Sequence, residues 1–214
     1  MSEICAQLHQ ALRVLERHRF PFDPKRIPSN GLYVLFEKGE TGHGGDRIVR
    51  VGTHTGEAQL QSRLKQHFIT PSKDRSIFRK NIGRAMLNRD HDPFIREWEF
   101  DLTTRKAKDE FGPLVDLKKQ AEVERKVSAH IQERFEFAVI AEAEKSARLD
   151  LEAKMVSTVS HCGDCGASAG WLGLSSPKDK IRESGLWQVN ELYGEGLSTS
   201  DLSRILVKVK CGLE

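Results

Sequence analysis

Two short apolar runs in the first quarter of the chain predict a β-hairpin. The first run is GLYVLFE at Gly31–Glu37, and the second is RIVRVG at Arg47–Gly52. Both are rich in β-branched and aromatic side chains, which favour strands. The segment between them, KGETGHGGD, contains several glycines, which readily adopt the backbone conformations of a turn. A hairpin that begins a sheet is therefore the first constraint on the fold.

Apolar residues at helical spacing predict the elements around this hairpin. An amphipathic helix is expected over residues 3–20, where apolar side chains recur from Ile4 to Leu15 ahead of a proline. Further helices are expected over Glu57–Phe68, Ser76–Asn88, Asp116–Arg134 and Glu144–Val159, and further strands over Phe94–Leu102 and Phe137–Ala141. We expect loops over 103–113 and 160–176, a short amphipathic piece over 179–185, and a helix or a strand over 202–210.

The composition excludes several classes of protein. Of the 214 residues, 38% are hydrophobic and 30% are charged, as in ordinary globular proteins, so a single domain over 1–214 is expected. No apolar run approaches the ~20 residues that span a bilayer, so we expect a cytoplasmic protein with no membrane partner. The net charge of +3 is too small for binding nucleic acid through bulk charge, and any such site must be a local basic patch.

Four segments, taken in order, resemble the GIY-YIG nuclease superfamily. GLY at 31–33 and RVG at 50–52 are similar to the family's two signature triplets. SRLKQHF at 62–68 is similar to its arginine helix, and LEAKMVSTVS at 151–160 to its glutamate helix. Each segment is unspecific alone, and their order carries the resemblance.

The resemblance implies a fold as well as a site. It implies an α/β fold with a small central, mostly antiparallel β-sheet flanked by α-helices. The nuclease-like core would span about 28–160, with an N-terminal helix at 3–20 and a C-terminal extension at 161–214.

The resemblance also assigns roles to three residues. Glu152 would hold one Mg²⁺ or Mn²⁺, because these hard cations are commonly bound through one or two carboxylates. Arg63 would bind phosphate oxygens, since its planar guanidinium matches them bidentately. Tyr33 would accept or relay the proton of the attacking water, and because a phenol is a weak base at neutral pH, it needs a cation nearby.

The sequence departs from the family at two places. Arg50 stands where the second triplet usually carries tyrosine, and it would supply the cation beside Tyr33. The asparagine that usually follows the glutamate helix is missing from CGDCGASAGWLG, and Ser168 or Asn190 could replace it.

Two histidines are further candidates for the site. His67 lies one helical turn after Arg63, where relatives carry His or Tyr, and would contact phosphate or assist proton transfer. His54, just after the second triplet, is the rival base.

Basic side chains on the expected helices could contact phosphates without reading sequence. Arg79, Lys80 and Arg84 are expected on the solvated face of the helix over Ser76–Asn88. Lys65 and His54 are the other candidates for contacts with nucleic acid.

Cys162 and Cys165 occur in HCGDC, a spacing found in metal and redox sites. A structural zinc needs four ligands, and the sequence shows His161 nearby and Cys211 only as a distant fourth candidate. Two packed thiols are therefore favoured over a zinc site or a redox centre.

These observations predict a divalent-metal-dependent endonuclease that hydrolyses DNA phosphodiester bonds, with RNA not excluded as a substrate. The alternative is a catalytically degenerate GIY-YIG-like module that only binds nucleic acid.

Overall fold

The computed structural model describes residues 2–211, except for the side chain of Cys211. The helices are α1 Ser2–Arg13, α2 Leu60–Phe68, α3 Ile77–Arg89, α4 Ile95–Trp98, α5 Arg105–Phe111, α6 Leu117–Arg134, α7 Lys145–Ser160, α8 Asp179–Ser184 and α9 Thr199–Cys211. The strands are β1 His18–Arg19, β2 Gly31–Gly42, β3 Gly45–Gly52 and β4 Phe135–Ala141. Short 3₁₀ turns occur at Pro24–Arg26, Lys73–Arg75, Gly112–Leu114 and Leu172–Ser175.

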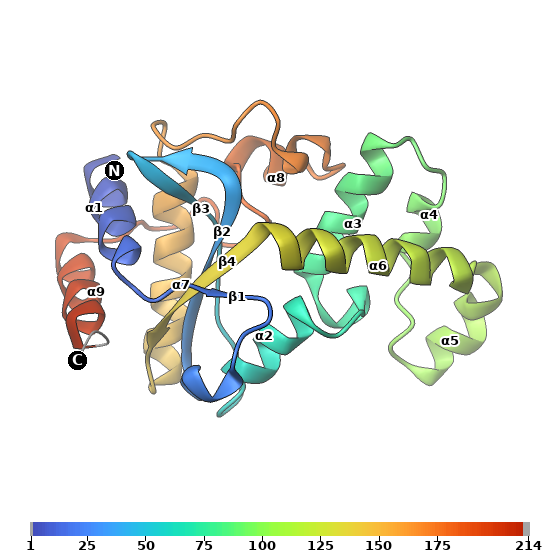
Figure 1. The fold of residues 1–214 in the computed structure, drawn as a ribbon, viewed down its shortest axis with the longest axis horizontal. Coiled ribbons are helices and arrows are strands. Elements are labelled where there is room, and N and C mark those ends of the chain that lie inside the picture. Colours follow the sequence, from blue (N-terminus) through green and yellow to red (C-terminus); the bar gives the residue numbers. More distant parts are fainter. Residues whose placement is uncertain (1, 212–214) are drawn as a thin grey trace.

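Within the described residues the strands form one four-stranded sheet in the order β1–β4–β2–β3, and every neighbouring pair is antiparallel. Helices α1, α7 and α9 lie on one side of this sheet, and α2, α3 and α6 lie on the other (Figure 1). The predicted fold class, a small antiparallel sheet flanked by helices, is confirmed.

Strand β2 contributes to a separate apolar core on each face of the sheet. Leu32 and Val34 pack in the core with α1, α7 and α9. Tyr33 and Leu35 pack in the core with α2, α3 and α6. All four are fully buried. A strand covered on both faces is apolar at successive positions instead of alternating, which explains the unbroken run LYVLF.

The glycines of the two signature triplets are required by close contacts. Tyr33 pairs with Gly52 across β2 and β3, and a Cβ on Gly52 would lie 2.2 Å from the phenolic oxygen of Tyr33. A Cβ on Gly31 would lie 2.3 Å from the carbonyl oxygen of Ile140 in β4. The tyrosine therefore keeps its place because the position across from it has no side chain.

The outer edge of β3 is covered by the segment that follows α8. The backbone N–H of Trp187 donates to the carbonyl of Val49 at 2.8 Å. The side-chain oxygen of Gln188 accepts from the backbone N–H of Val51 at 3.0 Å. These bonds satisfy backbone groups that an uncovered edge strand would expose.

The expected helix over 3–20 is shorter than predicted. Helix α1 ends at Arg13, and β1 at His18–Arg19 pairs with Phe137 and Glu136 of β4. The backbone groups of His18 and Arg19 find their hydrogen-bond partners in β4 and not in a longer helix. The helix therefore ends well before Pro21.

The strand predicted over Phe94–Leu102 is wrong. Helix α4 occupies Ile95–Trp98, and Trp98 is fully buried with its indole N–H on the carbonyl of Lys80. Phe94 and Trp98 are four residues apart, a spacing that also fits one face of a helix. The contact of Trp98 with Lys80 of α3 favours the helix over the strand. The expected loop over 103–113 likewise contains α5, which Thr104 caps.

The other expected elements are present. Ser76 caps α3, Asp116 caps α6 and Glu144 caps α7, each through a side-chain oxygen that accepts backbone N–H groups. The ambiguous segment over 202–210 belongs to helix α9.

Replacing Gly52 with alanine tests the contact between the triplets. The new methyl group would overlap the Tyr33 hydroxyl, so Gly52→Ala should lower the free energy of unfolding by about 1–3 kcal/mol, as overpacking commonly does. Gly170→Ala is the matched control, because a Cβ there meets nothing within 4 Å. Urea denaturation of both variants measures the difference, and equal stability of the two would contradict the contact.

Candidate active site

Tyr33 and His67 form a buried hydrogen-bonded pair between β2 and α2. The Tyr33 oxygen lies 2.7 Å from Nε2 of His67, and both side chains are fully buried. Nδ1 of His67 lies 2.7 Å from the hydroxyl oxygen of Ser76, the residue that caps α3. A chain of polar groups thus runs from β2 through α2 to the start of α3.

The imidazole of His67 is held neutral. Burial, assisted by the positive charges of Arg63, Arg50 and Arg79, lowers its pKa well below the usual 6.5. A neutral ring donates from one nitrogen and accepts at the other. His67 therefore links the Tyr33 and Ser76 hydroxyls with one donor and one acceptor.

Arg50 places a guanidinium beside this pair. Its Nε lies 3.5 Å from the Tyr33 oxygen, and its other arm donates to the backbone carbonyl of Trp187. The side chain is 6% exposed and lies near the ring of Phe78. The structure thus places the guanidinium of Arg50 next to Tyr33, as expected from the sequence.

Glu152 approaches the same end of the hairpin from α7. One carboxylate oxygen, Oε1, accepts from the backbone N–H of Thr53 at 3.2 Å, just after the second triplet. Burial raises the pKa of Glu152, and the charge of Glu191 adds to the rise. Arg50, the Thr53 N–H and Arg63 act in the opposite direction. Glu152 is thus a partly desolvated carboxylate within the field of both arginines.

Arg63 borders a pocket next to these groups. It is half-buried, and its Nη1 is 3.2 Å from the side-chain oxygen of Gln66 and 3.3 Å from the carbonyl oxygen of Arg75. The pocket has a volume of about 340 Å³ and is lined by Thr53, His54, Thr55, Gln59, Ser62, Arg63 and Gln66. Among the five candidates, Tyr33, Arg50 and His67 are buried, whereas Arg63 and Glu152 are half-buried. Arg63 and Glu152 therefore form the accessible part of the group.

His54 is committed to the backbone. Its Nδ1 donates to the carbonyl of Gly56 at 2.7 Å, and its Nε2 accepts from the N–H of Gly31 at 3.3 Å. Burial lowers its pKa. Both nitrogens of the neutral ring are therefore used, which makes His54 a brace for the loop after β3 more than a free base or a phosphate contact.

The basic side chains of α3 are not on a solvated face, and that prediction is wrong. Arg79 is fully buried and pairs with Glu124 of α6 at 2.7 Å. Arg84 pairs with the carboxylate of Glu99, and Lys80 donates to the Glu99 carbonyl at 2.7 Å. These charges hold α3 against α6 and the α4 region, so they are not free for phosphates. Lys65 on α2 is exposed, as expected.

The two candidates for the missing asparagine lie in different places. Ser168 donates from its backbone N–H to Glu40 at 3.0 Å and from its hydroxyl to the same carboxylate, so another group already binds it. Asn190 is exposed and precedes Glu191, whose charge acts on Glu152. The segment before Asn190 does fold back along β3, next to the site.

Several supporting residues were not identified from the sequence. Ser76 was expected only as the first residue of a helix, although its hydroxyl also binds His67. The Thr53 N–H and the Trp187 carbonyl orient Glu152 and Arg50. Backbone groups carry no residue-type signal, and contacts separated by 99 and 137 residues leave no local pattern.

The neutral imidazole of His67 makes stability depend on pH. Because its pKa is lowered in the folded protein, the unfolded chain binds a proton more readily as pH falls below about 6.5, and stability declines there. His67→Gln should flatten this decline by up to about 1.4 kcal/mol per pH unit. Urea denaturation between pH 5 and pH 7 measures it, with the exposed His91→Gln as control. An unchanged slope in His67→Gln would show that His67 is charged in the fold.

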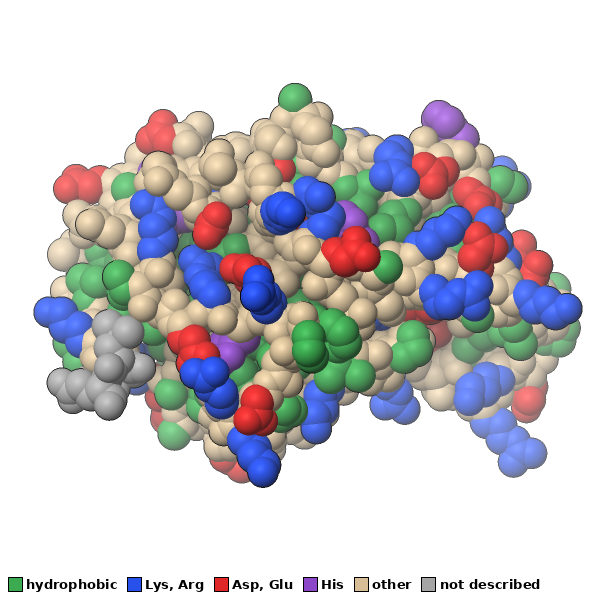
Figure 2. All heavy atoms as spheres, in the orientation of Figure 1, with side chains coloured by type: hydrophobic (Ala, Val, Ile, Leu, Met, Phe, Trp, Pro, Cys, Tyr) green, Lys and Arg blue, Asp and Glu red, His purple; other side chains and the backbone are tan. Residues whose placement is uncertain are grey.

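On the face shown in Figure 2, Lys and Arg side chains are mixed with Asp and Glu. This distribution agrees with the small net charge. In the described part of the chain, no helix combines the length and the apolar character that a membrane span requires.

Comparison with known proteins identifies the family. Searches of curated proteins and of solved structures gave no match. A family model described as GIY-YIG domain matches residues 3–209, which include most of α1 and most of α9. The chain therefore belongs to the GIY-YIG domain family, whose members are generally endonucleases.

Proposed function

We propose that the protein is a divalent-metal-dependent endonuclease that hydrolyses phosphodiester bonds of DNA. One observation carries this proposal. Tyr33, Arg50, Arg63, His67 and Glu152, which come from four separate elements, converge at one end of the β2–β3 hairpin. The group contains a carboxylate for a cation, guanidinium groups for phosphate charge and a hydroxyl–imidazole pair for protons.

The donor set around Glu152 fits Mg²⁺ or Mn²⁺. The Thr53 N–H donates to Oε1 of Glu152, while Oε2 of Glu152 has no protein donor among the described residues. Oxygen ligands from one or two carboxylates suit these hard cations, which keep several waters. When bound, such a cation stabilises the charge that develops on the phosphate and lowers the pKa of bound water.

Arg63 would bind the scissile phosphate. It lines the pocket beside Thr53, and its guanidinium has the planar geometry that matches two phosphate oxygens. Within residues 2–211 its guanidinium hydrogen-bonds to a neutral amide and a backbone carbonyl and forms no ion pair, so binding a phosphate would not require it to break one.

Tyr33 and His67 would relay the proton of the attacking water. They lie deeper in the protein than Arg63 and Glu152. Both are fully buried, so we assign them to a relay and not to direct contact with substrate. Arg50 donates to the phenolic oxygen and so helps to fix the position of the hydroxyl group. The hydrogen bonds from Tyr33 to His67 and from His67 to Ser76 would then provide a path for proton transfer.

Nuclease assays with metal controls test the proposal. Supercoiled plasmid, labelled single-stranded DNA and labelled RNA are incubated with the full chain in Mg²⁺, Mn²⁺ or EDTA. We expect cleavage of DNA that requires the metal. Arg63→Ala should lower the rate by about 10²–10³, as loss of one transition-state donor does, and Glu152→Gln should abolish cleavage.

Matched surface variants control for general effects on charge. Asp150→Asn lies on α7 two residues from Glu152 and is exposed, and Arg125→Ala is exposed on α6. Both should cut at the wild-type rate. Cleavage that survives both Arg63→Ala and Glu152→Gln would show that the site is assigned wrongly. Salt-sensitive DNA binding without cleavage under any condition would favour a degenerate binding module, which the arginine at position 50 and the missing asparagine would then explain.

Tyr33→Phe tests the proton relay separately. Phenylalanine fills the same core but removes the hydroxyl, so kcat should fall by about 10²–10⁴, as expected for lost acid–base catalysis. The KM should change little, and the pH profile of kcat should change shape. Tyr193→Phe is the matched control, because this other tyrosine is 58% exposed. A pH profile identical to wild type would remove Tyr33 from proton transfer.

A further inference from the structure

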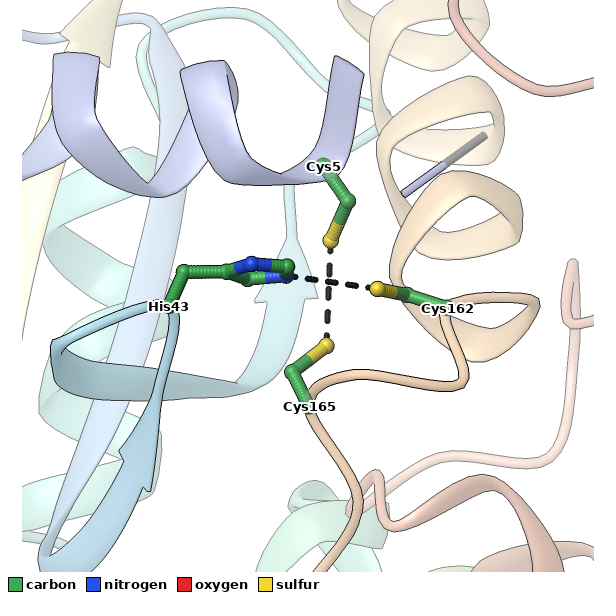
Figure 3. A group of neighbouring side chains, drawn as sticks. All are labelled: Cys5, His43, Cys162 and Cys165. Carbon is green, nitrogen blue, oxygen red and sulfur yellow. Dashed lines mark hydrogen bonds between the residues drawn. The ribbon is translucent and has the colours of Figure 1, made fainter. Parts of the chain in front are cut away.

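Four potential metal ligands meet on the sheet face opposite Tyr33 and His67. They are Cys5 of α1, His43 at the turn between β2 and β3, and Cys162 and Cys165 just after α7. Figure 3 shows the three sulfur atoms and the imidazole pointing toward one common centre. The cysteines are buried and free, and His43 is half-buried.

The separations of the ligand atoms suit a single tetrahedral ion. All four atoms lie within 4.8 Å of one another. The sulfur atoms of Cys5 and Cys165 are 3.7 Å apart, and a tetrahedral zinc with Zn–S bonds of about 2.3 Å separates two sulfurs by about 3.8 Å. Nε2 of His43 lies 3.2 Å from the sulfur of Cys162, against about 3.6 Å between nitrogen and sulfur ligands of zinc.

Other groups of the protein hold this arrangement in place. A side-chain nitrogen of Arg13 donates to the carbonyls of Gly42 and His43, at 2.8 and 2.6 Å, which fixes the turn that carries the histidine. A Cβ on Gly42 would lie 2.8 Å from the Cβ of Cys165. The absence of a side chain at Gly42 thus lets the cysteine loop approach the hairpin.

Neighbouring histidines are occupied elsewhere. Nδ1 of His9 donates to the carbonyl of Cys5 at 2.9 Å, and its Nε2 accepts from the N–H of Ile48 at 3.2 Å. His161 is exposed, and its Nδ1 lies 2.9 Å from the carbonyl oxygen of Ser157. His161, considered with Cys162 and Cys165 from the sequence, is therefore replaced by His43, which no local motif connects to them.

Packed thiols alone do not account for the geometry. Thiols that merely fill a core need no imidazole nitrogen directed at them, yet His43 contributes one from a turn in the left-handed region, with φ of 51°. Three thiolates and one imidazole form a Cys₃His set, which is typical of structural zinc. Four protein ligands leave no open coordination position, so such a site holds structure and does not perform hydrolysis.

We propose that Cys5, His43, Cys162 and Cys165 bind one Zn²⁺ in a closed structural site. The ion joins the first helix, the tip of the hairpin and the end of α7. Glu152 lies eight residues before Ser160, the last residue of α7, which is about 12 Å along a helix at 1.5 Å per residue, and Cys162 and Cys165 follow that end of the helix. The zinc site is thus separate from the group around Glu152 and does not depend on the nuclease proposal.

Metal analysis of the full chain tests the proposal. The protein is purified without a polyhistidine tag, and its metal content is measured by mass spectrometry. We expect one zinc per chain in the wild type and its loss in Cys162→Ser and in His43→Ala. His161→Ala and Glu152→Gln should keep the zinc, since neither residue is one of the four proposed ligands.

A second set of measurements uses the wild-type protein, so it tests the zinc site even where a ligand variant fails to fold. Wild-type protein loaded with Co²⁺ should show the visible bands of tetrahedral cobalt and the near-ultraviolet bands of thiolate ligation, and Zn²⁺ should displace them. Removal of zinc by a chelator should lower the melting temperature, because binding to a site that exists only in the fold stabilises it. Wild-type protein without stoichiometric zinc and without a thiolate–cobalt spectrum would overturn the proposal, as would a Cys5–Cys165 disulfide in the freshly purified protein.

Discussion

Burial of β2 on both faces is the constraint on which the rest of the structure depends. Alternate side chains of this strand enter two different cores, so helices must cover both sides of the sheet. A shift of register by one residue would move Tyr33 from the core that holds His67 to the core that holds Met155. The position of the tyrosine hydroxyl follows from packing, and the glycine across from it provides the room.

Buried charges link the helices on the face of the sheet that contains Tyr33. Arg79 reaches Glu124 and also donates to the backbone carbonyl of His67 at 3.1 Å. Leaving one partner of such a pair unpaired is strongly destabilising. Arg79 therefore links the backbone of His67 to α6, which helps to position His67.

The sequence predicts regular elements well where local chemistry and packing agree. The hairpin and the helices that begin after Ser76, Asp116 and Glu144 could all be predicted. The segment Phe94–Leu102 could not, because its apolar spacing fits a strand and a helix equally well, and Trp98 decides only through its contact with α3. The exposure of Arg79, Lys80 and Arg84 was predicted wrongly because their acidic or carbonyl partners lie on α6 and near α4. The order of the family's segments indicated five candidate site residues. The spacing in HCGDC drew attention to Cys162 and Cys165, whereas nothing in the local sequence connects Cys5 or His43 to them.

The segment that covers β3 has a consequence for the smallest unit that can fold. The Trp187 carbonyl accepts from Arg50, and the backbone of β3 is paired with residues 187 and 188. A chain cut after α7 would leave the buried guanidinium of Arg50 without its backbone acceptor, and it would expose the edge of β3 that does not pair with β2. Such an edge invites pairing with other chains, so the shortened protein would aggregate even though every residue of the two triplets and both signature helices were still present.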